Sequence, residues 1–252
     1  MRVQTGDNVG IGGFIVTGSV PKHVLIRAIG PSLSGFGVPD PLMDPTLELH
    51  GPTGFATITN DNWREDSGQE ALIIASGLPP SNNLEAAIDV TLAPGAYTAI
   101  VAGKNNSAGV ALVEVYDLNQ AANSQLANIS TRAFVSTADN IVIAGFILGN
   151  NSGNDKVVVR GLGPSLGAVG VPNALANPLL ELRDNNGTLL QQNNNWQDDA
   201  GQAAELTAAG LAPSNNLESG LVAILPPGAY TALLAGVNNG TGIGLVEVYD
   251  LP

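Results

Sequence analysis

The 252-residue sequence contains no cysteine, and its basic residues are few. The lack of cysteine excludes disulfides, catalysis by a thiol and metal sites with cysteine ligands. Nine Lys and Arg stand against 22 Asp and Glu, which gives a net charge of −13. The excess of acid divides almost evenly between residues 1–118 and 119–252. Without a basic face, neither nucleic acid nor an anionic membrane surface is an expected partner.

Histidine and long apolar runs are scarce as well. The only histidines are His23 and His50, and the second half of the chain has Lys156 and Arg183 in their places. No Gly-x-Ser-x-Gly elbow accompanies them, so we expect no catalytic residue and no enzyme activity. No apolar run approaches the roughly 20 residues of a membrane span, so we expect no membrane insertion. No signal peptide is present, and we expect any export signal to lie outside this sequence.

The chain contains the same long pattern twice. Pro-Ser-Asn-Asn-Leu-Glu begins at Pro80 and again at Pro213, and Leu-Val-Glu-Val-Tyr-Asp-Leu ends at Leu118 and again at Leu251. Both pairs are 133 residues apart. A self-similar period of this length indicates two copies of one structural unit.

Within each copy the pattern is that of short strands separated by turns. Apolar and β-branched segments alternate with Gly, Pro and Asn turns, which is typical of antiparallel β-proteins. One helix is predicted per copy, over 69–75 and 202–208, with Asp66 and Asp199 as caps near its start. The sequence therefore predicts an all-β fold of two tandem antiparallel β-sandwich, jelly-roll-like domains, each with one short helix.

The predicted domains are residues 1–118 and 126–252, joined by a linker over 119–125. Residues 126–135 are predicted to form an extra first strand of the second copy, since Met1 aligns with Ala133 and the first copy has no counterpart. The first copy would then have an open sheet edge that invites strand addition. The alternative is that this segment is only a linker.

Each of the two copies resembles one known family over nearly its whole length. The motifs that carry the resemblance are GPSL, NDNW, PPSNNLE, LAPGAYTA and LVEVYDL in the first copy, with close versions in the second. They resemble a repeat of large secreted or surface-displayed bacterial proteins. The middle and end of each copy also broadly resemble pre-peptidase C-terminal β-sandwiches. The resemblance implies an extracellular or cell-surface, non-catalytic, structural or adhesive module, and it supplies no catalytic residue.

A polar loop in each copy offers two candidate sites. Its carboxylates could bind Ca²⁺ together with amide oxygens, or could serve only as turn and helix-capping residues. These carboxylates are Asp61, Glu65, Asp66, Asp198 and Asp199. The only tryptophans, Trp63 and Trp196, lie beside Asn62 and Asn195 and could stack on a sugar, or could fill the core.

Arg27 and Arg160 lie in the middle of strands, as do Glu48 and Glu181 two elements later. Their repetition predicts a structural Arg–Glu pair across strands in each copy. Glu114 and Glu247 of the last strand are predicted to face solvent.

Differences between the copies mark a candidate interface. Asp89, Thr91 and Lys104 of the first copy become Val222, Ile224 and Val237 in the second. An exposed apolar patch of this kind usually marks an interaction surface, although a loop of the same domain could cover it.

Together with the repeat and the family resemblance, these features predict that the chain is a spacer, stalk or self-associating fibre module without cofactor. Its partners would be neighbouring repeats or further copies, and the alternative is a glycan-binding module.

Overall fold

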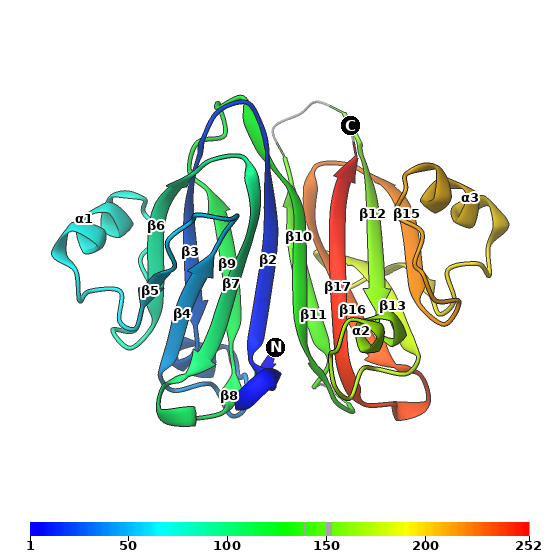
Figure 1. Ribbon diagram of the computed structural model, residues 1–252, viewed down its shortest axis with the longest axis horizontal. Coiled ribbons are helices and arrows are strands. Elements are labelled where there is room, and N and C mark those ends of the chain that lie inside the picture. Colours follow the sequence, from blue (N-terminus) through cyan, green and yellow to red (C-terminus); the bar gives the residue numbers. More distant parts are fainter. Residues whose placement is uncertain (139, 150–152, 252) are drawn as a thin grey trace. The chain divides into compact units, whose positions relative to one another are not determined.

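The computed structural model describes residues 1–138, 140–149 and 153–251. They divide into two compact units, Met1–Ala127 and Asn128–Pro252, which we call unit 1 and unit 2. Both units consist mainly of antiparallel strands, which confirms the predicted all-β class (Figure 1). No helix of the described residues is long and apolar enough to cross a membrane.

Unit 1 has two main sheets. The strands of the first, in spatial order, are β2 (Gly10–Gly18), β7 (Gly95–Gly103), β4 (Pro45–His50) and β5 (Ile58–Asn60). Those of the second are β6 (Ala86–Leu92), β3 (Lys22–Ile29) and β9 (Leu112–Asp117). A short pair, β1 (Arg2–Val3) with β8 (Gly109–Val110), completes the strands. The remaining elements are the 3₁₀ turns η1 (Gly6–Asn8), η2 (Pro31–Phe36) and η3 (Lys104–Asn106) and the helix α1 (Ser67–Ala75).

Unit 2 repeats this arrangement with one addition. One set of strands lies in the order β15 (Ser219–Leu225), β12 (Asp155–Leu162), β17 (Gly242–Leu251) and β10 (Ser124–Val135). The other set is β11 (Val142–Leu148), β16 (Gly228–Gly236), β13 (Pro178–Asp184) and β14 (Leu189–Asn193). The helical elements are α2 (Pro164–Ala168), α3 (Ala200–Ala208) and the 3₁₀ turn η4 (Val237–Asn239).

The segment over 126–135 is a strand. β10 begins at Ser124, and its residues Asn128–Val135 pair antiparallel with β17. The alternative of a structureless linker is therefore wrong for this segment, and the last two residues of the predicted linker already belong to the strand.

The helices differ from the prediction in one respect. α1 and α3 form where they were expected, with Asp66 and Asp199 as N-caps. Unit 2 has a second short helix, α2, where one helix per copy was predicted. Its Gly-Pro-Ser-Leu sequence places a proline at the first helical turn, where the missing N–H costs least. The same motif forms the 3₁₀ turn η2 in unit 1.

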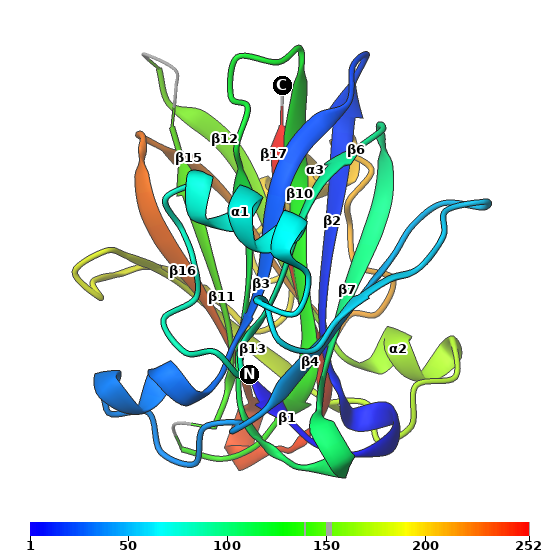
Figure 2. The ribbon, with the colours of Figure 1, turned by 90° about the vertical axis from the view of Figure 1, so that its left-hand side faces the viewer.

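Two apolar layers hold unit 1 together. The larger core lies between its sheets and includes Phe14, Ile26, Leu47 and Val101. A smaller cluster lies on the other side of the β6-β3-β9 sheet, where Ile73 of α1 packs on Leu25. Figure 2 shows α1 in front of the strands of this unit. Strand β6 is consequently buried on both faces.

Candidate functional site

The two tryptophans are core residues. The Trp63 side chain is 1% exposed and packs with Leu25, Ile73 and Ala87, and its indole N–H donates to the carbonyl of Asn82 at 3.1 Å. Trp196 is 9% exposed and lies in the corresponding cluster of unit 2. The core-packing alternative is confirmed, because an indole buried in this way offers no face for a sugar.

The asparagines beside them serve the same loops. The Asn62 side-chain amide donates to Glu65 Oε1 at 2.7 Å, and that of Asn195 donates to the Asp198 carboxylate at 3.3 Å. In unit 1 the guanidinium of Arg64 lies 3.9 Å from the centre of the Trp63 ring. The glycan hypothesis thus loses the ring faces on which it depended.

The acidic loop residues have separate local partners. Asp66 Oδ1 accepts from the Gln69 N–H at 2.8 Å, and Asp199 Oδ1 accepts from the Gln202 N–H at 2.9 Å. Asp61 pairs with Lys104. In the described ranges, no group of three or more His, Cys, Asp or Glu could hold a metal ion. The capping alternative is therefore confirmed for Asp66 and Asp199.

The three residues of the candidate interface do not form one surface. Val222 is 8% exposed and packs on Trp196 and on Leu206 of α3. The interface hypothesis is therefore wrong for Val222, and the alternative that its own domain covers this face is confirmed, with α3 as the cover. Ile224 is 68% exposed. Val237 lies beyond the far end of the nine-residue strand β16, on the order of 30 Å of chain from the turn that follows Ile224.

Arg27 does pair with a glutamate, but not with Glu48. Its Nε donates to Glu114 Oε2 at 2.9 Å, and its Nη1 donates to the Leu78 carbonyl at 2.7 Å. The reason is topological, since β3 pairs with β9 in register at Arg27 and Glu114, whereas β4 belongs to the other sheet. The Glu48 carboxylate instead lies beside His50, with 3.2 Å between Glu48 Oε2 and His50 Nε2.

A tyrosine completes this cluster. The Tyr116 hydroxyl donates to Glu114 Oε1 at 2.8 Å and accepts from Arg27 Nη2 at 3.0 Å. Burial, with the neighbouring Glu114 carboxylate, raises the pKa of Tyr116 above its usual value. Unit 2 repeats the cluster, and its members are Arg160, Glu247 and Tyr249. The predictions of an Arg160–Glu181 pair and of solvent-facing Glu114 and Glu247 are therefore wrong, and Glu181 pairs with Arg183.

Sequence reasoning missed a buried glutamate that joins two repeated motifs. Glu85, the last residue of Pro-Ser-Asn-Asn-Leu-Glu, is 0% exposed. Its Oε1 accepts from the backbone N–H of Gly30 at 3.2 Å and of Ser32 at 3.0 Å, and its Oε2 accepts from the Asn82 N–H at 3.1 Å. The Ser32 hydroxyl also donates to Oε1 at 2.5 Å. Glu85 thus ties η2 to the loop before β6.

Unit 2 contains the same network around Glu218, which is also 0% exposed. It accepts from the N–H groups of Gly163, Ser165 and Asn215. The available signal was that Gly-Pro-Ser-Leu and Pro-Ser-Asn-Asn-Leu-Glu are among the motifs that both copies keep without change.

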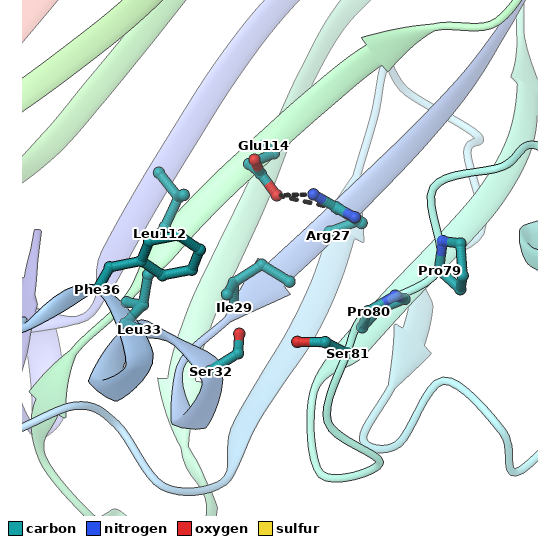
Figure 3. A pocket seen from close by; sticks show the side chains of 10 residues that line it. All are labelled: Arg27, Ile29, Ser32, Leu33, Phe36, Pro79, Pro80, Ser81, Leu112 and Glu114. Atoms are coloured by element: carbon teal, nitrogen blue, oxygen red, sulfur yellow. Dashed lines mark hydrogen bonds and ion pairs between the residues drawn. The ribbon is translucent and has the colours of Figure 1, made fainter.

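A groove of about 430 Å³ in unit 1 lies beside the Arg27–Glu114 pair (Figure 3). Its lining is mainly apolar, with Leu33 and Phe36 on one side and Pro79 on the other. Phe36 is 84% exposed and Leu112, at the start of β9, is 40% exposed. A second groove of similar volume, in unit 2, is lined by Ile224. The groove of unit 1 thus offers apolar contact area beside the Arg27–Glu114 pair, whose polar atoms already have partners within unit 1.

Comparison with known proteins gives no family. No family model matches the chain, and no curated protein matches it. Among solved structures, a crystal structure of the STIV MCP has 11% identity and a TM-score of 0.24, and covers 99% of this chain and 93% of that one. An atomic structure of Sulfolobus turreted icosahedral virus has 10% identity and a TM-score of 0.26, and covers 99% and 88% respectively. These scores are too low to relate the folds.

Proposed function

We propose that the chain is a non-catalytic structural module in which two β-sandwich domains of one repeat provide surfaces for assembly with further repeats. The observation that carries the proposal is the use of the residues that both units share. Glu85 and Glu218 hold the same loop network, and Arg27 and Arg160 hold the same three-residue cluster. The repeated chemistry therefore maintains the fold twice over.

The exposed apolar residues support assembly. Phe36 and Val169 occupy the same position in the two units and are 84% and 77% exposed. Leu84 and Leu217 are a second equivalent pair, at 43% and 47%. Large apolar side chains that stay exposed at matching positions are suited to contacts that recur along an array.

The proposed setting is the surface of a bacterium or its secreted material. It rests on the resemblance of the GPSL, PPSNNLE and LVEVYDL motifs to repeats of such proteins, together with a strongly acidic, cysteine-free composition.

The test is self-association of the purified chain. We expect light scattering to give a mass that rises with protein concentration, and electron microscopy to show ordered particles or filaments. Phe36→Ser and Val169→Ser should lower the mass, while Glu48→Gln, at a residue whose side chain is 51% exposed, is the matched surface control. A monomeric mass at every concentration, unchanged in the variants, would contradict assembly through these residues.

A further inference from the structure

Strand β9 of unit 1 has a free edge where its counterpart in unit 2 has a partner. In unit 2, β17 lies between β12 and β10. In unit 1, β9 pairs with β3 on one side, and in the part of the chain that the structure describes no strand pairs with its other side. The two strands have the same sequence, Leu-Val-Glu-Val-Tyr-Asp, at 112–117 and 245–250.

The first residues of unit 1 show which partner fits this edge. β1 pairs Arg2 with Val110 and Val3 with Gly109. These pairs match Phe134 with Ile243 and Val135 with Gly242 in unit 2. β1 is therefore the end of a β10-type strand. Within the described residues, the pairs of β10 from Asn128 to Arg132 have no counterpart in unit 1, and they would fall on Leu112–Tyr116 of β9.

The valines of β9 are less buried than the equivalent valines of β17. Val246 and Val248 of β17 are 0% and 4% exposed, whereas their equivalents Val113 and Val115 of β9 are only half-buried. Because the residues themselves are identical, their neighbours set the difference. An open edge usually carries a protecting Lys or Pro, and residues 112–117 contain neither.

The groove of unit 1 adjoins the same edge. Leu112 and Glu114 of β9 line it together with Phe36 of η2 (Figure 3). In unit 2, Arg132 of β10 is paired with Leu245, the equivalent of Leu112. A strand in the same register on β9 would therefore place its last residue opposite Leu112, which lines this groove.

We propose that the Leu112–Tyr116 edge of β9 binds, antiparallel and in the β10 register, the strand that precedes another repeat of this type. The occupant is an extended segment with the chemistry of residues 124–132, neutral and small on its inner face with a basic residue at its end. Main-chain hydrogen bonds provide the affinity and the groove provides the register. This inference rests on the proposed function, to which it adds a mode of assembly.

The first test is binding of a synthetic peptide with the sequence of residues 123–132 to the full chain. The peptide ends before the positions that Met1–Val3 already occupy. We expect saturable binding, with at least about tenfold slower hydrogen exchange at those β9 amides that do not donate to β3. The equivalent amides of β17 serve as the internal control, since β10 already covers them and the peptide should not change their exchange.

A second peptide with Ile129→Pro should not bind, because proline removes an N–H and interrupts the strand. Absence of peptide binding, equal binding of both peptides, or protection at β11 in place of β9 would each overturn the proposal. Peptide binding is measured separately from the mass of the chain, so a failure of the β9 edge and a failure of self-association are distinguishable results.

The second test places the strand in the same chain. Fusing residues 121–132 directly before Met1 continues β1 in register, because Met1 aligns with Ala133. We expect the midpoint of thermal unfolding of unit 1 to rise by at least about 3 °C, since each kcal/mol shifts a domain of this size by a few degrees. The same fusion with Ile129→Pro should give no rise, and equal midpoints for the two fusions would refute the assigned register.

Discussion

Replacing Glu85 with alanine should destabilise unit 1 more than any exposed substitution. The carboxylate is 0% exposed and accepts from the backbone N–H groups of Gly30, Ser32 and Asn82. A buried donor left without an acceptor costs about 1–3 kcal/mol. Three such donors give about 3–9 kcal/mol, and relaxation of η2 brings the expected loss in the free energy of unfolding to about 3–5 kcal/mol.

The assay uses the single tryptophan of each unit. In a Trp196→Phe background, Trp63 fluorescence reports urea unfolding of unit 1. Glu85→Gln keeps one carbonyl oxygen but places an NH₂ against a backbone donor, so we expect an intermediate loss of about 1–2 kcal/mol. This variant stays informative if Glu85→Ala does not fold. A loss for Glu85→Ala no larger than that for exposed Glu48→Ala, about 0.5 kcal/mol or less, would refute the role of this network.

Three further perturbations test local features. Asp66→Ala should cost about 1 kcal/mol and speed hydrogen exchange in the first turn of α1, because it removes the N-cap; unchanged exchange would contradict this. Gly30→Ala should destabilise unit 1 by several kcal/mol in urea unfolding, since an added Cβ would lie 2.0 Å from the Leu42 carbonyl oxygen. An unchanged midpoint of urea unfolding would contradict this expectation. Burial and the charge of Asp155 raise the pKa of Asp250, so the folded state holds the Asp250 proton more tightly than the unfolded state. This carboxylate therefore lowers stability as pH rises from the unfolded value of about 3.9 through the raised pKa, and Asp250→Asn should raise the melting temperature at pH 7 but not at pH 3.

The sequence was sufficient to predict the strands because the turns that bound them are encoded locally. Proline, glycine and asparagine mark the ends, and Asp66 with Gly77 marks the helix. It was not sufficient to predict which faces are buried. Between residues 84 and 92, apolar residues such as Ile88 alternate with a second set that includes Asp89, a pattern that predicts a half-buried strand. In the structure α1 and Trp63 cover the second face, so Asp89 is 7% exposed.

The partners of the repeated polar residues were also beyond the sequence. In a repeat, each pair recurs at the same offset, so repetition cannot distinguish Glu48 from Glu114 as the partner of Arg27. Only the order of strands in the sheets decides between them. The Glu85 network was hidden for a similar reason, because two of its three backbone donors, Ser32 and Gly30, lie 53 and 55 residues away along the chain.

The differences between the units are of two kinds. In the first kind, a charged residue is replaced by one of opposite charge while the strands keep their pairing. Lys22 is 0% exposed and pairs with Asp117 at 2.8 Å in unit 1, and Asp155 and Asp250 occupy these positions in unit 2. The fold therefore does not depend on that ion pair. At the edge of β9 the chemistry is kept while the neighbour differs, since the same six residues have β10 beside them only in unit 2. A difference in residues changes the stability of one unit. The unpaired edge of β9 has the same residues as β17, whose edge binds β10, so β9 should bind a strand of the same kind. Partner binding should therefore be sought at the edge of β9.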